Sequence, residues 1–290
     1  MKRTFYLILA AITAFSISGC KKIWDYINSS GPGGVVQECR IAMIENFDSL
    51  PSNPRTFYKN TVKFIYNPQG NLTEIRQSAT AEVPQEFIPG VYRFDSYFNY
   101  DSQNRLKSYV SNAGPSPVVP GLITAAEWHW YTYTDDYNII DTIAFYTQGR
   151  PLTSNYPDNY SHIEIEHIKL DTYGRVAEVK EFDGGGNYIN TTNYSYDASG
   201  NLIAPGATYT DKMNMYQTSK TLMFVYKDYS VNDRVGNTVS YNNKNLPKKL
   251  EPKGQIYSKI PLFNFDEEGS PHYDMDHYIT VSYDCKQLFN

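Results

Sequence analysis

Residues 196–202, Tyr-Asp-Ala-Ser-Gly-Asn-Leu (YDASGNL), indicate the fold class because their pattern specifies the tip of a β-hairpin. The pattern predicts a three-residue loop with Gly200 in the left-handed region, which is a type I turn closed by a G1 bulge. Asp197 then accepts a backbone N–H within the turn. Tyr196 faces Leu202 across the hairpin, and such a pair contributes roughly 0.2–1 kcal/mol over an alanine pair.

Relatives of this stretch recur along the chain: YNPQGNL (66–72), YDSQNRL (100–106) and LDTYGRV (170–176). In the second of these, Asn104 stands in the glycine position, and asparagine tolerates the left-handed backbone. The intervals between copies are irregular, which favours an array of hairpins over a solenoid.

Two further copies are imperfect. The copy that begins at Tyr241 is one residue shorter, so we expect a two-residue Asn243–Lys244 loop that places Tyr241 opposite Leu246. The stretch YTDDYNI (133–139) keeps the spacing but has Tyr137 where glycine is wanted. We expect a degenerate turn there.

Alternation with period two dominates the segments between the tips, as in VYRFDSYFNY (91–100) and LMFVYK (222–227). No long amphipathic helix is predicted. We therefore expect residues 37–290 to form one all-β domain. It would be an antiparallel hairpin meander, either a strongly curved sheet or a closed or nearly closed soluble barrel.

Longer, proline-containing connections separate the hairpins: SATAEVPQEFIPG (78–90), SNAGPSPVVPG (111–121) and TQGRPLTSNYPDNY (147–160). Antiparallel strand order puts the tight turns at one end of the sheet and these loops at the other. Binding residues concentrate on long loops, so the long-loop end is the expected functional end.

The N-terminus has the three parts of an export signal, namely Lys2 and Arg3, an apolar run over 5–17, and small residues before Cys20. The apolar run is too short to span a membrane, which takes about 20 residues. The ending Ile-Ser-Gly-Cys resembles the bacterial lipobox, whose signal is cut before a cysteine that then receives lipid. This implies a signal peptide over 1–19 and a lipid on Cys20. An ordinary signal with an incidental cysteine is the alternative.

Residues 20–36 follow as the lipidated cysteine and a flexible tether, whose Ser-Ser-Gly-Pro-Gly-Gly centre has linker composition. Such a coil reaches about 20–24 Å. The whole chain carries 31 acidic and 26 basic residues, a net charge of −5. Removal of Lys2 and Arg3 leaves 24 − 31 = −7. A chain of this charge with no basic run is a poor nucleic-acid binder.

Two cysteines remain, Cys39 in the first strand-like segment and Cys285 in the last. Export favours oxidation, so we expect a bridge that joins the first and last strands. Two separate buried thiols are the alternative, because sequence does not establish pairing.

The Y-D-x-x-G-N/R-L form resembles the YD repeats of Rhs-type wall and toxin-shell proteins, which are far longer. The lipobox, short linker and YD-like hairpins together resemble a group of Bacteroidetes-type lipoproteins of unknown function, some with a porin-like β fold. This resemblance implies a curved antiparallel sheet or barrel and no established activity. Charged residues at mid-strand, such as Lys63 and Lys180, argue against a membrane-spanning barrel.

No catalytic motif is present, and we expect no cofactor. HIEIEH (162–167) suits a solvated strand face better than a metal site. In HYDMDH (272–277), His272, Asp274 and Asp276 share one strand face, which makes them a weak candidate for a hard cation. Asp274 and Asp276 are also the first place to look for a glycosidase pair. An exposed acidic loop is the plainer interpretation.

Trp128 and Trp130 share one face of ITAAEWHWYTY (123–133) and form a candidate strip for stacking a sugar or peptide, with sheet core as the alternative. The sequence thus predicts an anchored cell-envelope protein of the outer membrane. Its β domain would be a binding or structural module that uses the long-loop end for a glycan or peptide. The alternative is a glycan-directed hydrolase near Asp274 and Asp276.

Overall fold

The computed structural model describes residues 39–50, 53–81, 95–115, 123–149, 157, 159–236, 238–251 and 279–285. Thirteen of the described strands form one antiparallel sheet in the order β10-β9-β8-β7-β6-β5-β4-β3-β2-β1-β15-β14-β13. The meander runs β1 (Cys39–Leu50), β2 (Asn53–Tyr66), β3 (Leu72–Ala81), β4 (Asp95–Tyr100), β5 (Leu106–Pro115), β6 (Ile123–Tyr133), β7 (Asn138–Gly149), β8 (His162–Leu170), β9 (Val176–Asp183) and β10 (Tyr188–Asn193).

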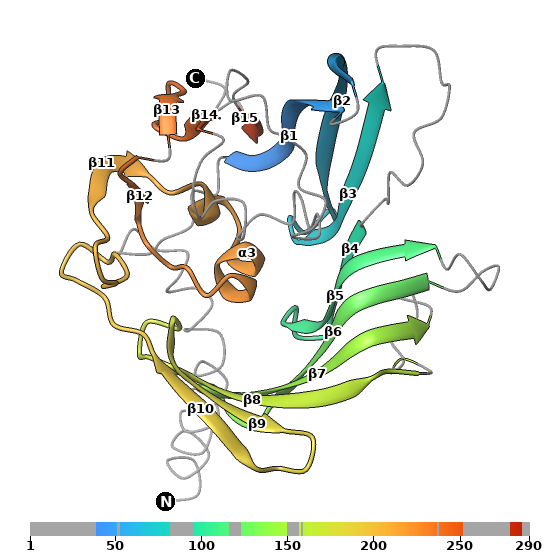
Figure 1. The fold of residues 1–290 in the computed structure, drawn as a ribbon. Helices are drawn as coiled ribbons and strands as arrows, with labels where there is room; N and C mark the ends of the chain where they lie inside the picture. The colour runs from blue at the N-terminus through green and yellow to red at the C-terminus, as the bar shows by residue number, and fades with distance from the viewer. Residues whose placement is uncertain are drawn as a thin grey trace, which may run out of the picture.

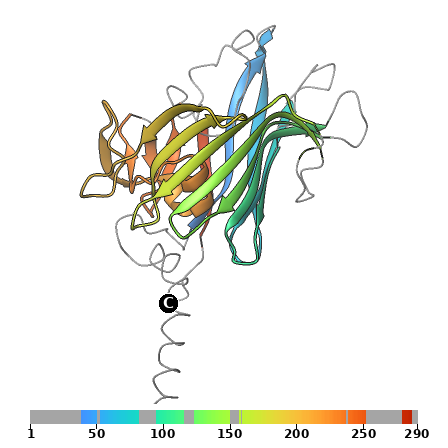
Figure 2. The same cartoon turned by 90° about the horizontal axis from the view of Figure 1, so that it is seen from below.

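The remaining segments complete the sheet and fill its hollow side. β13 (Thr238–Tyr241), β14 (Pro247–Leu250) and β15 (Ile279–Cys285) return to pair with β1, while β11 (Tyr209–Met213) and β12 (Asn232–Arg234) form a separate ribbon. A 3₁₀ helix η1 (Met215–Thr218) and the helix α3 (Lys220–Val225) lie between them in the chain. The sheet curls around α3 (Figures 1 and 2).

The predicted antiparallel meander and its strong curvature are confirmed. The described strands do not close into a barrel, because their order ends at β10 on one side and at β13 on the other. The fold is an open, curved sheet whose two edges do not pair with each other among these residues.

The hairpin tips have the predicted geometry. The end pairs are Tyr66 with Leu72, Tyr100 with Leu106, Leu170 with Val176 and Tyr196 with Leu202. Gly70, Asn104, Gly174 and Gly200 all have positive φ, between 64° and 88°. In the tip at 196–202, Asp197 accepts the N–H groups of Ser199 and Asn201 at 2.9 and 2.8 Å. Aspartate or asparagine at this position accepts an equivalent N–H in the other tips, at Asn67, Asp101, Asp171 and Asn242.

The prediction of a shortened loop after Tyr241 is wrong. Asn245 takes the left-handed position with φ 60°, and its N–H bonds to the Asn242 carbonyl at 3.0 Å. Tyr241 therefore pairs with Pro247 and not with Leu246. Asparagine in the glycine place preserves the full seven-residue tip, as it does at Asn104.

The stretch at 133–139 is degenerate as expected. Tyr133 still pairs with Ile139, but Asp135 accepts the N–H groups of Tyr137 and Asn138 in a different loop. A further tip, not predicted from the sequence, lies in FDGGGNY (182–188), where Phe182 pairs with Tyr188 and Gly186 has φ 82°. It joins β9 to β10 at the end opposite to the other tips.

In three tips the first residue is a tyrosine whose hydroxyl bonds to the end of the preceding tip. The hydroxyl of Tyr100 donates to the Leu72 carbonyl at 2.7 Å, Tyr133 to Leu106 at 2.9 Å, and Tyr196 to Val176 at 3.0 Å. Each acceptor is the last residue of a preceding tip. Arg105 and Arg175 also lie over the tyrosine ring of the next tip, at 4.2 and 3.9 Å. At the 170–176 tip, which begins with Leu170, the Leu170 N–H donates instead to the Tyr137 carbonyl at 2.8 Å.

The expected strand at 222–227 is also wrong, because Lys220–Val225 is helical. An unbroken apolar run satisfies either period, so alternation did not discriminate. The Ser219 side chain caps the helix by accepting the Leu222 N–H. Leu222 and Met223 are almost fully buried.

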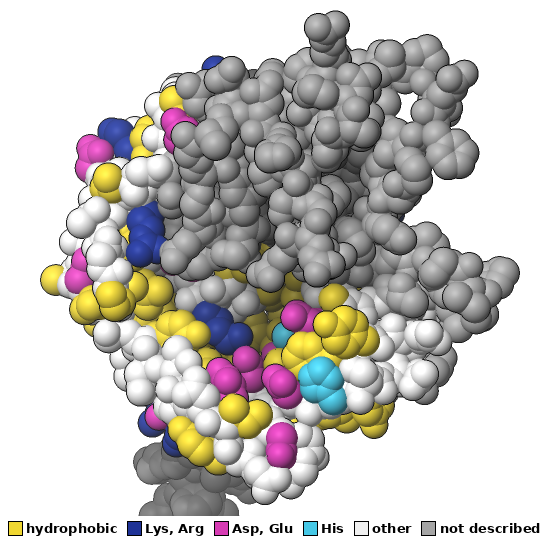
Figure 3. All heavy atoms as spheres, viewed as in Figure 1, with side chains coloured by type: hydrophobic (Ala, Val, Ile, Leu, Met, Phe, Trp, Pro, Cys, Tyr) yellow, Lys and Arg dark blue, Asp and Glu magenta, His cyan; other side chains and the backbone are white. Residues whose placement is uncertain are grey.

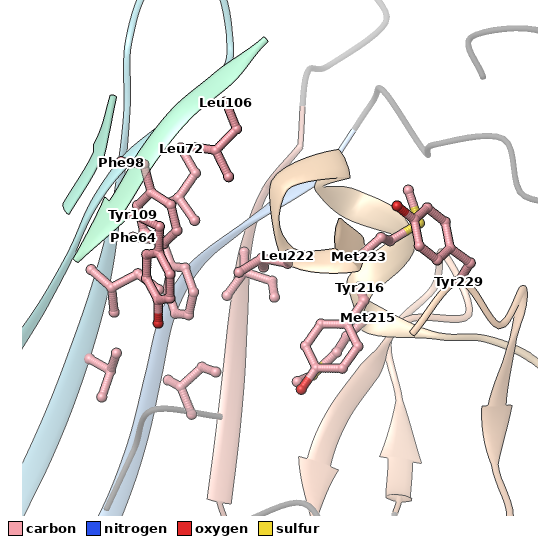
Figure 4. Close-up of a cluster of buried hydrophobic side chains, with 14 of the residues drawn as sticks. Phe64, Leu72, Phe98, Leu106, Tyr109, Met215, Tyr216, Leu222, Met223 and Tyr229 are labelled. Carbon is pink, nitrogen blue, oxygen red and sulfur yellow. The ribbon is translucent and has the colours of Figure 1, made fainter. Parts of the chain in front are cut away.

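The core lies between this helical segment and the hollow side of the sheet (Figure 4). Leu222, Met223 and Tyr216 join one apolar cluster with Leu72 and Phe98 of the sheet. Burial of each large aliphatic side chain contributes about 1.5–3 kcal/mol. The hairpin array therefore needs the α3 segment to cover its concave face.

Candidate functional site on the concave face

Strand register arranges the concave face of β6–β9 in rows across the sheet. The row nearest the tips is apolar and contains Tyr133, Ile139, Ile168 and Val179. The next row contains Tyr131, Asp141, Glu166 and Glu181, and the one after it contains His129, Ile143, Glu164 and Asp183. The last row, toward the long-loop end, contains Glu127, Phe145 and His162. The apolar row at the tips is therefore followed by three rows that each contain at least one carboxylate.

Two charged groups neutralise the innermost carboxylates. His129 contacts Asp141 through Nδ1 at 2.8 Å and Glu127 through Nε2 at 3.3 Å. Lys227, just after α3, places its ammonium 3.1 Å from Glu166. Lys227 has φ 52°, so a left-handed residue directs this side chain from the helix onto the sheet. These contacts join the α3 segment to strands β6–β8.

The surroundings of His129 favour its charged form. Burial opposes protonation, but the Asp141 charge and the hydrogen bonds to Asp141 and Glu127 outweigh it and raise the pKa of His129 to about 9. The hydrogen bond from His129 in turn lowers the pKa of Glu127. Burial likewise opposes the charge on Lys227, yet Glu166 and Asp141 raise its pKa. His129 and Lys227 are thus both positively charged near neutral pH.

Asp141 is the deepest member of the site, with 1% of its side chain exposed. Its Oδ2 meets His129, while Oδ1 has no hydrogen-bond partner among the described residues. The rings of Tyr109 and Tyr131 stack on either side of His129 at 5.3 and 6.1 Å. The pair therefore lies enclosed beneath the more open residues.

The outer rows are accessible. Phe145 and His162 stack in parallel, with ring centroids 4.4 Å apart and planes 3° apart. The side chains of Glu127, Glu164 and His162 are 42%, 40% and 50% exposed. Figure 3 shows acidic, histidine and hydrophobic side chains gathered together on this side of the molecule. We call Glu127, Phe145, His162 and Glu164 the rim site.

Tyr146, the next residue after Phe145, adjoins the rim site. It is 73% exposed and has φ 48°, a conformation that bulky side chains rarely adopt. Such strain at an exposed aromatic residue is typical of positions under functional constraint. Tyr146 lies toward the long-loop end of β7.

The predicted stacking strip divides between two environments. Trp128 is 3% exposed and packs with Val110, Ala125 and Ala144, so its ring is core and offers no face to a ligand. Trp130 is half-buried beside Lys107, whose ammonium lies 5.1 Å from the ring centroid. Both lie on the face opposite to His129. On the concave face, the stacked pair of rings is instead Phe145 and His162.

The remaining residues singled out from the sequence are the two paired cysteines, the acidic candidates near residue 274 and the lipidation site. β1 pairs with β15, and Cys39 and Cys285 are joined in the structure with their sulfurs 2.07 Å apart. His272, Asp274 and Asp276 lie outside the described residues, as does Cys20 with the signal and tether. In the described parts, no group of histidine, cysteine and carboxylate side chains fits a metal ion, and no helix is long and apolar enough to cross a membrane.

Sequence reasoning missed most of the concave site. HIEIEH does place His162, Glu164 and Glu166 on one face, as expected, and that face is the concave one. The partners Glu127, His129, Asp141 and Lys227 come from three other segments. The alternation E-x-H-x-Y at 127–131 is a signal that such a polar row exists, since it puts charged groups on a strand otherwise rich in aromatics.

Comparisons with known proteins give no family. No family description and no curated protein matches the chain. Among solved structures, it is similar to a porin-like protein from Bacteroides uniformis, with 10% identity and a TM-score of 0.40 over 85% of this chain and 96% of that one. It also matches the Tc holotoxin pore of Photorhabdus luminescens, with 13% identity and a TM-score of 0.09 over 57% and 12%. At these TM-scores neither likeness supports a conclusion.

Proposed function

We propose that this chain is a lipid-anchored protein of the cell envelope that binds a glycan at the rim site. The anchor is supported by the lipobox-like ending at Cys20. The binding function is supported by one observation: a parallel aromatic–imidazole stack flanked by exposed carboxylates on the concave face. The site lies toward the long-loop end of the sheet.

The chemistry of the rim site suits a sugar. The carbon-bound hydrogens of a pyranose pack on aromatic faces, and its hydroxyl groups donate hydrogen bonds to carboxylates. Phe145 supplies the ring, while Glu127 and Glu164 supply acceptors that are 42% and 40% exposed. The fixed ion pairs beneath hold these residues in place, which lowers the entropic cost of binding.

A glycan array with the full chain in detergent tests the proposal. Phe145→Ala and Glu164→Gln are each expected to weaken the best ligand about tenfold, the equivalent of roughly 1.4 kcal/mol. Tyr137→Ala is the matched control, because Tyr137 is 40% exposed at the tip end of the sheet. Absence of any glycan ligand, or equal losses in all three variants, would contradict the proposal.

The same array reports on the hydrolase alternative, since cleavage would release product. Asp274→Asn and Asp276→Asn abolish that release if the two residues form a glycosidase pair.

The lipid anchor is tested by a separate experiment. Cys20→Ser is expected to move the protein from the membrane fraction to the soluble fraction after cell lysis.

A further inference from the structure

The concave face of β6–β9 holds more acid than base. Among the described residues, strand register places six carboxylates on this face: Glu127, Asp141, Glu164, Glu166, Glu181 and Asp183. Two cations, His129 and Lys227, form ion pairs with members of this set. Leaving His162 aside, six formal negative charges therefore face two positive ones.

The two cations are committed to deeply placed carboxylates. His129 contacts Asp141 at 2.8 Å and Lys227 contacts Glu166 at 3.1 Å, and the side chains of these two acids are 1% and 15% exposed. A buried carboxylate without a partner is strongly destabilising, so the fold itself requires these pairs. The excess of negative charge therefore falls on the other carboxylates of the face.

Like charges also face each other across β8 and β9. Glu164 is opposite Asp183, and Glu166 is opposite Glu181. Directly opposite residues have Cβ atoms about 4.5–5.5 Å apart, a position at which like charges are destabilising. Asp183 retains its charge there, because hydrogen bonds from Asn187 lower the pKa of its carboxyl.

The convex face of the same two strands has the opposite arrangement. Lys169 is opposite Glu178, and Lys180 contacts Glu178 at 3.2 Å. Alternate residues of a strand point to opposite faces, so one hairpin carries matched charges on one side and unmatched acids on the other. The excess of acid is therefore specific to the concave face.

The unmatched acids border the aromatic stack of the rim site. Glu164 follows His162 on the same face, with its carboxylate 3.7 Å from Nε2, and Glu127 is opposite Phe145. The stacked rings therefore lie between two exposed carboxylates. An ammonium group within about 6 Å of an aromatic centroid is attracted by the ring, and its N–H groups donate hydrogen bonds to carboxylates.

We propose that the rim site selects a glycan with a free amino group, whose ammonium lies beside Glu164 and the Phe145 ring. This inference rests on the proposed glycan-binding function and adds the charge of the sugar. The excess of acid attracts an ammonium, gains nothing from an N-acetyl group and repels a carboxylate. The expected order of affinity is therefore amino sugar, then N-acetylated sugar, then acidic sugar.

Titration calorimetry of the full chain in detergent tests this order. The ligands are oligomers of glucosamine, N-acetylglucosamine and galacturonic acid of equal length, at a pH of about 6, where amines are protonated. We expect the glucosamine oligomer to bind about tenfold more tightly than its N-acetylated form. The preference should fall as salt is added, because exposed charges are screened.

Two variants that each remove one negative charge separate a local effect from the net charge of the chain. Glu164→Gln is expected to bring the affinities for the glucosamine and N-acetylglucosamine oligomers within about threefold of each other. Glu178→Gln removes the same charge from the convex face and is the matched control. It should leave the preference at about tenfold.

Three results would overturn the inference while glycan binding at the rim site stands or falls separately. A parent chain that binds neutral or acidic glycans as tightly as amino glycans, or an equal preference in Glu164→Gln and Glu178→Gln, would remove the charge selection alone. A lysine-rich peptide that binds more tightly than any amino sugar would assign the site to a peptide. Binding of no glycan of any kind would overturn the proposed function together with this inference.

Discussion

The tip end and the concave charged rows of the same sheet are built in opposite ways. Each tip is a seven-residue unit whose turn, cap and end pair are local, and in three tips the first tyrosine bonds to the end of the preceding tip. The charged rows instead take Glu127, Asp141, Glu166 and Lys227 from four separate segments. A local unit tolerates the loss of one contact, whereas a buried network leaves a charge unpaired when one member is removed.

Asp141→Ala, in the charged rows, is expected to cost more stability than any substitution in a tip. It leaves His129 charged or desolvated without its closest partner, and we expect a loss of about 3–5 kcal/mol in the free energy of unfolding. Denaturant unfolding measures it. The double variant Asp141→Leu with His129→Leu should recover much of the loss, because both buried charges are gone and Glu127, which loses His129, is 42% exposed to water. A loss below about 1 kcal/mol for Asp141→Ala would remove the distinction.

The pH dependence of stability should come from the charged rows. The pKa of His129 is about 9 in the folded chain, above the value of about 6.5 in an unfolded one. Its protonation therefore stabilises the fold fully below pH 6.5, and this contribution is lost as the pH rises through 9. We expect the melting temperature to fall over that interval, with up to about 3 kcal/mol at stake. His129→Gln should flatten the dependence of the melting temperature on pH between about 6.5 and 9. An unchanged slope in this variant would show that the dependence comes from other groups.

Gly70→Ala tests how much the left-handed backbone position contributes to the stability of a tip. Gly70 has φ 88°, and a Cβ there meets no atom within 4 Å, so the substitution changes backbone strain alone. We expect a loss of about 1–2 kcal/mol. Gly70→Asn is the control, since Asn104 and Asn245 adopt the same region in other tips. Equal losses for the two variants would show that the left-handed backbone is not the cause.

Tyr100→Phe gives the smallest expected effect. It removes the hydroxyl that bonds to the Leu72 carbonyl at 2.7 Å and contacts Thr221 of α3. One such bond contributes about 0.5–1.5 kcal/mol. Tyr137→Phe, in an exposed loop, should change the unfolding free energy by much less. If the two variants behave alike, the contact chain between tips contributes nothing to stability.

The same contrast explains how much could be predicted from the sequence. The turn chemistry of Asp197 and Gly200 is local, so the hairpins and their end pairs followed from seven residues. The tip at Tyr241 was misread because the asparagine in the glycine place was not carried over from Asn104. The α3 helix and the Lys227–Glu166 pair form through packing against the concave face of the sheet. A local sequence pattern does not predict such long-range packing. The rim site needed strand register that only the folded chain provides.

A crystal structure of the chain with the best ligand of the glycan array tests the central claim most directly. The account predicts a sugar ring packed against Phe145 or His162 on the concave face, with hydroxyl groups within hydrogen-bond distance of Glu127 or Glu164. A ligand bound at the tip end, or on the Trp130 face with the rim site untouched, would contradict it.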